Sequence, residues 1–250
     1  MSPGSLVRRL APVAMAALVV GVSAGETLAY QATVDVNDSA FGPPCLSFHD
    51  TYPEKMLAAA AAGFSTLGYP TTTYTGAAFT KAQTLARAVT DDGFYVHSHG
   101  DYYWYSPESR RYSGFREDSG DCTQQVVFSN EIQARRAGRL SNLIFISTCH
   151  LADATTTMPA AFAIDKAKAG ATGWLGPKFY VSYLGSAWDS DEWLFERAFW
   201  DQLRLGRATG VAFDTAMLSA FGHSDFDADW WGSYSYSGKP GPQGSCKGCS

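Results

Sequence analysis

The sequence is short of basic residues, and no part of it is long and apolar enough to cross a membrane. Its 250 residues carry 19 Lys and Arg against 24 Asp and Glu, which gives a net charge of −5 at pH 7. An acidic chain is poorly suited to nucleic acid or to an anionic membrane, so we expect neither as a partner. The uncharged apolar stretch at residues 10–24 is shorter than the roughly 20 residues that a spanning helix needs. We therefore expect no membrane span.

The N-terminus has the layout of a secretory signal peptide. Arg8 and Arg9 precede the apolar stretch, and small residues suitable for cleavage follow at 22–24 and at 27–29. We predict that residues 1–24 are removed and that the mature protein is secreted. Removal takes away two Arg and no acid, so the net charge falls from −5 to −7. The rest of the chain has no internal repeat and no long linker, and its length suits one domain.

Cysteines are few, and their number is odd. In an exported chain thiols tend to pair, so one of the five should remain free. Cys246 and Cys249 could close on each other, which would leave Cys45 to pair with Cys122; other pairings would link the tail to the body, and the sequence leaves these alternatives open. We expect Cys149 to stay a free thiol because it ends an apolar strand. A small buried hydrophobic residue is the other interpretation of Cys149.

Segments with strand and helix patterns alternate along the chain. Alternation of this kind indicates βαβ units and a mostly parallel sheet. We predict a single α/β domain over residues 30–236, with a doubly wound, mostly parallel sheet flanked by helices, and a Gly/Pro/Cys tail at 237–250. The predicted strands are Thr33–Val36 or Leu46–Phe48, then 69–74, 94–99, 143–149 and 171–176; the predicted helices are 51–63, 77–90, 130–139, 159–169, 189–205 and 209–218. An insertion at 101–124, rich in Tyr, Ser and Gly, interrupts the alternation, and its aromatic run at 102–105 is typical of hairpin packing.

Two of the predicted strands end in reactive side chains. Phe94–His99 ends in an imidazole, and Leu143–Cys149 ends in a thiol. The carboxyl ends of neighbouring parallel strands meet at one crevice, where ligands usually bind. We therefore expect His99 and Cys149 to lie close together, with the thiol as a nucleophile and the imidazole as its proton acceptor and donor.

The order and spacing of these motifs resemble the caspase-like superfamily of cysteine peptidases, which includes caspases, gingipains, clostripain and CHAT domains. Members share a strand that ends His-Gly and, about 50 residues later, a strand that ends small-x-Cys. The matching segments are His99-Gly100 and Ser147-Thr148-Cys149, and the helix end at 199–208 is similar to one common in CHAT domains. The resemblance covers roughly residues 45–220.

The resemblance implies a cysteine-type peptidase that acts on a peptide or protein without a cofactor. Cys149 would be the nucleophile, His99 the acid and base, and the backbone N–H groups of Gly100 and Cys149 the oxyanion hole. An imidazolium beside the thiol should lower the pKa of Cys149. His97 and His150 depart from the family pattern and could modify the site. A chain that keeps the fold without turnover, as a binding module, is the alternative.

Acidic residues follow the strand that comes after Cys149, where relatives shape their specificity pocket. Asp189 and Asp191 could therefore bind an Arg or Lys side chain of the substrate. The spacing Asp189-x-x-Glu192 is also that of a capping box ahead of an apolar helix, and this is the interpretation that the pattern favours.

Three further patterns suggest other chemistry. His97-x-His99-x-Asp101 matches most of the zinc-binding signature of metallo-β-lactamase-like hydrolases, but Tyr102 stands where that signature has His, and His150 and His223 lie in other contexts. The segment 222–226 lacks the second Gly of a serine nucleophile elbow. The alternating acids Asp225, Asp227 and Asp229 lack the Gly and Glu of a calcium loop. We expect no metal site at any of these segments.

Overall fold

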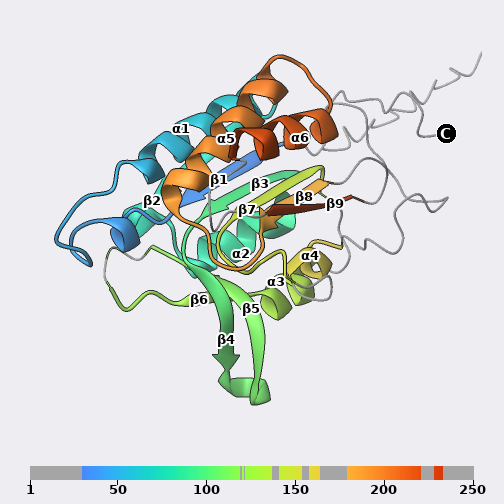
Figure 1. Ribbon diagram of the computed structural model, residues 1–250. Coiled ribbons are helices and arrows are strands. Elements are labelled where there is room, and N and C mark those ends of the chain that lie inside the picture. Colours follow the sequence, from blue (N-terminus) through green and yellow to red (C-terminus); the bar gives the residue numbers. More distant parts are fainter. Residues whose placement is uncertain are drawn as a thin grey trace, which may run out of the picture.

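A six-stranded sheet forms the centre of the protein, in the order β2-β1-β3-β7-β8-β9 (Figure 1). The computed structural model describes residues 30–118, 120, 122–136, 141–153, 158–163, 179–220 and 228–232. The strands are β1 (Ala32–Val36), β2 (Thr71–Thr75), β3 (Gly93–His97), β7 (Leu143–Ser147), β8 (Phe179–Tyr183) and β9 (Ala228–Gly232). All neighbours pair parallel except β8 and β9, which pair antiparallel. The predicted α/β fold with a mostly parallel, doubly wound sheet is confirmed.

The strand order reverses beside β1. The chain runs outward from β1 to β2 and then crosses to β3 on the other side of β1. A reversal of this kind opens a crevice at the carboxyl ends of the strands, which is where ligands bind in such sheets. Register places Val36, His97 and Ser147 side by side at this edge.

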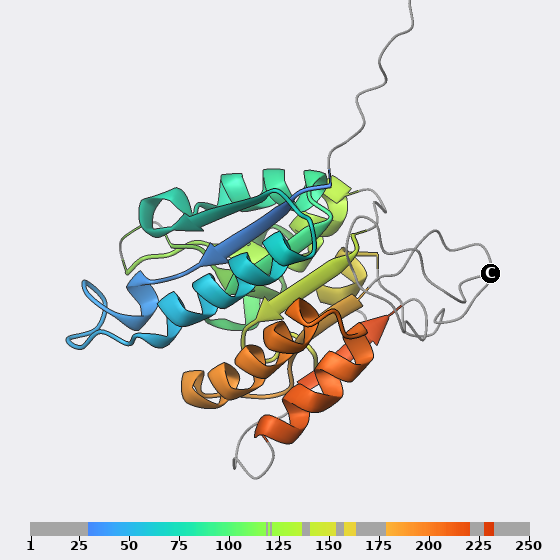
Figure 2. The ribbon, with the colours of Figure 1, turned by 90° about the horizontal axis from the view of Figure 1, so that it is seen from above.

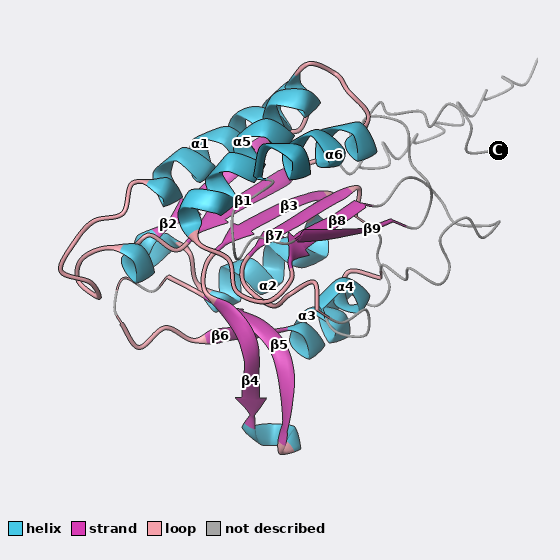
Figure 3. Ribbon diagram, in the orientation of Figure 1, coloured by secondary structure: helices cyan, strands magenta, loops and turns pink. Residues whose placement is uncertain are grey.

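Helices cover both faces of the sheet (Figures 2 and 3). The side chains of the strands alternate between the two faces. One face, here called the α5 face, packs against α1 (Tyr52–Thr66), α5 (Asp189–Arg204) and α6 (Thr209–Ala220). The other, the α2 face, packs against α2 (Lys81–Thr90), α3 (Ser129–Arg136) and α4 (Met158–Ala161). Tyr95 and Phe145 point to the α5 face, whereas Phe94 and Ile144 point to the α2 face. This period of two is the pattern of a sheet buried on both sides.

The α5 face is packed around Trp200, which is fully buried. Gly63 of α1 lies against its indole ring, and a Cβ at that position would come within 2.2 Å of Trp200 Cε3. Only glycine leaves room for the ring. At its carboxyl end α5 is followed by Gly206, whose φ of +78° is the left-handed conformation that commonly ends a helix.

A second, antiparallel sheet fills the predicted insertion. It consists of β4 (Gly100–Tyr105), β5 (Arg110–Arg116) and β6 (Val126–Phe128), and the β4–β5 hairpin projects from the body (Figure 1). Tyr105 makes edge contacts with Tyr112 and Phe128, with ring centroids 5.6 and 4.9 Å apart. The predicted role of these aromatic residues in hairpin packing is confirmed at Tyr105.

Some predicted boundaries are wrong. The segment Leu46–Phe48 forms no strand, so β1 is the first strand. β3 ends at His97 rather than His99, because the chain changes sheets there: Ser98 N still donates to Ser147 O, but His99 O accepts from Arg116 N of β5. Strand β8 was not predicted, and the expected strand at 171–176 lies outside the described residues, as does the end of the helix expected at 159–169.

Cys45 and Cys122 form a disulfide with a Cα–Cα distance of 5.3 Å. This is one of the pairings that the sequence left open. Cys149 is a free thiol, as predicted. The predicted signal peptide and the cysteines at 246 and 249 lie outside the described residues. Within the ranges given above, none of the helices combines the length and apolar character that crossing a membrane requires.

Candidate active site

A pocket of about 480 Å³ opens where the chain leaves the carboxyl ends of β1, β3 and β7. His99 and Cys149 both line it, so the structure brings the two predicted residues to one cavity. Its walls are mostly apolar, with three acids and, among the described residues, no Lys or Arg. The apolar side chains are those of Ala40, Phe41, Leu46, Phe48, Tyr52, Ala187 and Trp188, and the acids are Asp50, Asp189 and Glu192.

The thiol of Cys149 is held by the backbone of Ala187. It donates to the carbonyl oxygen at 3.7 Å and accepts from the N–H at 3.5 Å. Burial raises the pKa of Cys149, and the nearby Glu192 and Asp189 raise it further. The predicted low pKa is therefore wrong for the free protein, because the charges around the thiol are carboxylates, which oppose a thiolate.

The imidazole of His99 is fixed by two contacts. One ring nitrogen donates to the carbonyl of Ala40, and the ring lies against Phe41, with centroids 4.6 Å apart. Burial lowers the pKa of His99, and the charge of Arg116 lowers it further. Since the carbonyl can only accept, the other nitrogen carries the lone pair, which is the form that a general base needs.

Gly100 is a glycine because the turn after β7 passes directly over it. A Cβ there would lie 2.5 Å from Thr148 Oγ1 and 2.8 Å from the carbonyl oxygen of Cys149. The contact places the start of β4 against the backbone of the thiol-bearing residue. Glycine permits this approach, as it does at many ligand sites.

Polar side chains gather on the α5 face beneath the pocket. The Glu196 carboxylate accepts from Tyr95 Oη at 2.7 Å, from Ser147 Oγ at 2.5 Å and from Tyr183 Oη at 3.0 Å. Burial raises the pKa of Glu196 to about 7. Three hydroxyl donors from β3, β7 and β8 thus satisfy this fully buried carboxyl.

His97 lies beside this group and is 1% exposed. Its Nδ1 is 3.1 Å from Ser147 Oγ and 3.5 Å from Glu192 Oε2, and its ring stacks on Phe41 at 4.8 Å. Because the Ser147 proton goes to Glu196, Nδ1 carries the hydrogen that binds Ser147 Oγ. Nε2 is buried without a partner. Burial lowers the pKa of His97 to about 3, and the charge of His99 contributes, so the ring is neutral.

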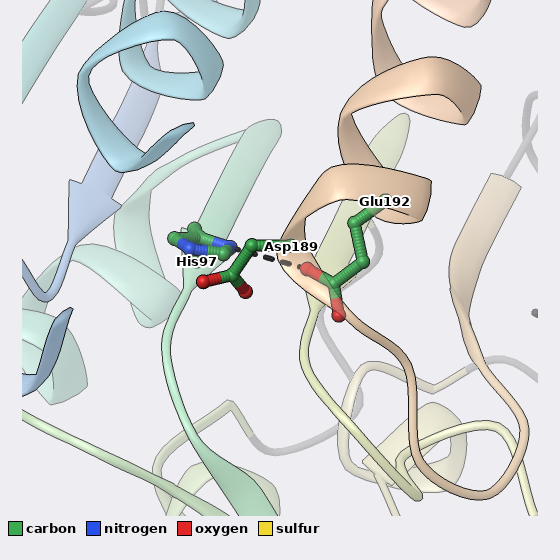
Figure 4. A group of neighbouring side chains, drawn as sticks. All are labelled: His97, Asp189 and Glu192. Carbon is green, nitrogen blue, oxygen red and sulfur yellow. Dashed lines mark ion pairs between the residues drawn. The ribbon is translucent and has the colours of Figure 1, made fainter. Parts of the chain in front are cut away.

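His97, Asp189 and Glu192 converge (Figure 4). One potential ligand atom from each lies within 4.8 Å of the others. Among the described residues no other group of three His, Cys, Asp or Glu meets that condition, so His97 does not share a cation site with His99 and Asp101. The Asp101 carboxylate instead accepts from the N–H of Tyr102.

The predicted capping box at the start of α5 is wrong. The residue that precedes the helix is Trp188, and no side chain caps it. Asp189 lies in the pocket, where burial and then the hydrogen-bonded carboxyl of Asp50 raise its pKa to about 7. Burial and then the charge of Asp189 raise the pKa of Glu192. Asp191 is not among the pocket residues; its carboxylate lies 3.5 Å from Ser190 Oγ.

His150 is also outside the pocket lining. It has a φ of +65°, its Nδ1 lies 2.9 Å from Asp153 Oδ2, and its N–H donates to the carbonyl of Gly185. Asp153 Oδ1 in turn accepts from the N–H of Gly185. His150 therefore braces the loop after Cys149. His223, the segment 222–226 and Asp227 lie outside the described residues.

The sequence reasoning missed one wall of the pocket, which the segment from Ala40 to Tyr52 supplies. Leu46 and Phe48 are exposed apolar residues, and Asp50 faces Asp189. The sequence signal for this wall is Cys45. A disulfide from a loop cysteine to a distant part of the chain holds the loop in place, so residues near Cys45 could have been expected to form part of a pocket. The disulfide to Cys122 spans 77 residues of sequence.

No protein-family model matches the sequence, and no curated protein matches it. Among solved structures, the chain is similar to the crystal structure of protein GSU0716 from Geobacter sulfurreducens. The sequences are 12% identical, the match covers 82% of this chain and 93% of that one, and the TM-score is 0.47. A likeness at this level carries no argument about function, so the chemistry of the site rests on its own residues.

Proposed function

We propose that the protein is an exported cysteine-type peptidase in which Cys149 is the nucleophile and His99 the acid and base. The observation that carries the proposal is their position: they follow adjacent parallel strands and line a single pocket. The hydrogen bond of His99 to Ala40 and the contact of Gly100 with Cys149 support it. The disulfide supports export, since such bonds persist in oxidising surroundings.

In this reaction the Cys149 thiol gives its proton to His99, and the sulfur attacks the substrate carbonyl carbon. The C–N bond breaks, His99 returns the proton to the departing amine, and a thioester remains. Water then attacks the thioester carbonyl, which releases the carboxylic acid and regenerates the thiol. Backbone N–H groups of Gly100 and Cys149 would stabilise the oxyanion in both steps. Because the thiol is neutral in the free protein, its proton leaves only as the sulfur attacks.

The pocket favours a substrate with a Lys or Arg beside the cleaved bond. Its apolar walls suit an alkyl stem, and Asp50, Asp189 and Glu192 suit a cationic end. Among the described residues that line the pocket, none is a Lys or Arg that could bind an acidic side chain of a substrate. A long basic side chain would thus place its charge by Asp189 and its carbonyl near Cys149.

The test is cleavage of a peptide library by the purified mature protein, followed by single variants. We expect cuts after Lys or Arg, loss of all turnover in Cys149→Ala, and a loss of at least about 100-fold in His99→Ala. Asp201→Asn, an exposed replacement near the other end of α5, is the control and should keep its activity. Full activity in Cys149→Ala would refute the mechanism, and cuts after other residues would refute the specificity.

The raised pKa of Cys149 favours a second candidate, a binding module that holds basic peptides without cutting them. The same library separates the two. A module would bind Lys or Arg peptides and leave them intact, whereas a peptidase would cut them.

A further inference from the structure

We propose that His97, Asp189 and Glu192 bind one divalent transition-metal cation of the zinc class at the floor of the pocket. The ligands would be one imidazole nitrogen and one oxygen from each carboxylate. This site differs from the His-x-His-x-Asp pattern in the sequence, since only His97 belongs to both. The site shares Asp189 and Glu192 with the subsite proposed for a Lys or Arg side chain, so a bound cation and a basic side chain would compete for these two carboxylates. It does not depend on the thiol chemistry, because none of its ligands is the nucleophile.

The first support is the distance between the ligand atoms. One atom from each of the three residues lies within 4.8 Å of the others. Ligands held at 2.0–2.2 Å from a tetrahedral zinc lie about 3.4 Å from one another, so the ligand atoms need to approach one another by at most about 1.4 Å. Asp189 and Glu192 lie one turn apart at the start of α5, and both carboxylates extend toward the imidazole (Figure 4).

The second support is the unused nitrogen of His97. The imidazole is buried, its Nδ1–H is bound to Ser147 Oγ, and its Nε2 has no partner. The nitrogen that lies 3.5 Å from Glu192 Oε2 is Nδ1, so the Glu192 carboxylate has to move toward Nε2 for that nitrogen to share a cation with it. A metal-bound histidine has one nitrogen on the cation and the other on a hydrogen-bond acceptor that fixes its orientation. Ser147, which itself donates to Glu196, is that outer partner.

The third support is charge. In the part of the chain that the structure describes, Asp189, Glu192 and Glu196 form no ion pair with a Lys or Arg; Glu192 pairs only with His97, at 3.5 Å. Carboxyl groups that lie together without such a cation keep protons, and a divalent ion can displace those protons when it binds.

The donor set selects the kind of ion. A nitrogen with two carboxylate oxygens suits zinc, cobalt or nickel, whereas calcium and magnesium prefer oxygen ligands alone and a higher coordination number. Three protein ligands leave a fourth position open, and Asp189 and Glu192 line the pocket, through which a cation can enter.

The test is metal binding by the purified mature protein after treatment with a chelator. Calorimetry with Zn²⁺ should give one site, and Co²⁺ should give the visible absorption bands of a nitrogen- and oxygen-ligated ion. His97→Gln, Asp189→Asn and Glu192→Gln should each weaken binding by more than 100-fold, beyond the roughly 10–100-fold expected for Ser147→Ala, which removes only the outer partner. Asp189 is only half-buried, so its variant keeps the test valid if the buried replacements fail to fold.

Two controls separate this site from other places where zinc could bind. Cys149→Ala removes the proposed nucleophile and should leave the affinity unchanged; this result would hold whether or not the protein is a peptidase. His150→Gln removes the surface pair with Asp153 and should also have no effect. Loss of binding in either variant, a preference for Ca²⁺ or Mg²⁺, or full affinity in Asp189→Asn would overturn the proposal.

Discussion

The two faces of the sheet each bury carboxyl groups, and they do so differently. On the α5 face, Glu192 and Glu196 lie near the strand ends and beside the pocket. On the α2 face, Asp35 lies within β1 and is covered by α2, whose Thr84 and Gln83 donate to it at 3.1 and 3.2 Å. The contrast teaches that burial of an acid does not by itself make a site. A buried acid can take part in binding or catalysis where the sheet opens to a pocket, as at Glu192. Where a helix covers the acid, as α2 covers Asp35, the acid contributes to packing alone.

The largest effect that tests this contrast is the pH dependence of stability caused by Asp35. Burial raises its pKa from 3.8 to about 8; Asp91 adds to the shift, while Thr84, Gln83 and Arg87 oppose it. The folded chain therefore keeps a proton that the unfolded chain releases, and the free energy of unfolding falls as pH rises from about 4 to about 8. The difference over that range is on the order of 5 kcal/mol.

Asp35→Asn should remove this dependence. Denaturant unfolding should show the variant more stable than the parent at pH 8 and similar to it at pH 4. A parent and a variant with parallel pH profiles would mean that Asp35 is ionised in the folded chain, and the contrast between the faces would fail.

The second effect concerns the pocket wall on the α5 side. The Cys45–Cys122 bond closes a loop of 77 residues, and such a loop restrains the unfolded chain by about 4 kcal/mol. Cys45→Ser with Cys122→Ser should lower the free energy of unfolding by that amount. Hydrogen exchange should then rise at residues 42–50 and stay unchanged in α2, which the bond does not touch. Equal loss of protection on both faces would contradict this.

The third effect tests the hydrogen bonds of Glu196. An amide offers one acceptor oxygen in place of two, so Glu196→Gln leaves at least one of the Tyr95, Ser147 and Tyr183 hydroxyls unsatisfied. We expect a loss of about 2 kcal/mol in chemical denaturation, from the cost of an unpaired buried donor. Asp201→Asn, an exposed replacement on the same helix, should leave stability nearly unchanged. A neutral Glu196→Gln would show that this network contributes little.

The smallest effect compares helix starts on the two faces. Thr80 caps α2 by accepting from the N–H of Gln83, whereas Thr51 precedes α1 without a side-chain cap bond. Thr80→Ala should cost about 1 kcal/mol in the same denaturation assay, and Thr51→Ala should cost little. An equal loss of unfolding free energy in the two variants would show that the Thr80 cap contributes no more to stability than Thr51 does.

The sequence predicted the strands whose apolar runs are continuous, and it placed both reactive side chains at one edge. It located the end of β3 two residues too late, because Ser98 and His99 continue the pattern locally. The chain actually leaves the sheet there to pair with β5, a contact between residues far apart in sequence. β8 was missed although its Phe179–Tyr183 run is fully buried.

The site was predicted in part for the same physical reason. His99 and Cys149 follow strands, so sheet topology brings them together, and Asp189 begins the next helix. Asp50 lies opposite Asp189 only because the disulfide-tied segment folds across the pocket. The helical pattern of Asp189 and Glu192 favoured a cap, and their convergence on His97 depends on how α5 sits over the sheet.

Phe41 has a consequence of its own. Its ring lies against both imidazoles, 4.8 Å from that of His97 and 4.6 Å from that of His99. A phenyl ring has no hydrogen-bond donor or acceptor and no exchangeable proton, so neither imidazole can pass a proton through the ring face that Phe41 covers. Replacing Phe41 with a smaller side chain would therefore open both histidines to water at once.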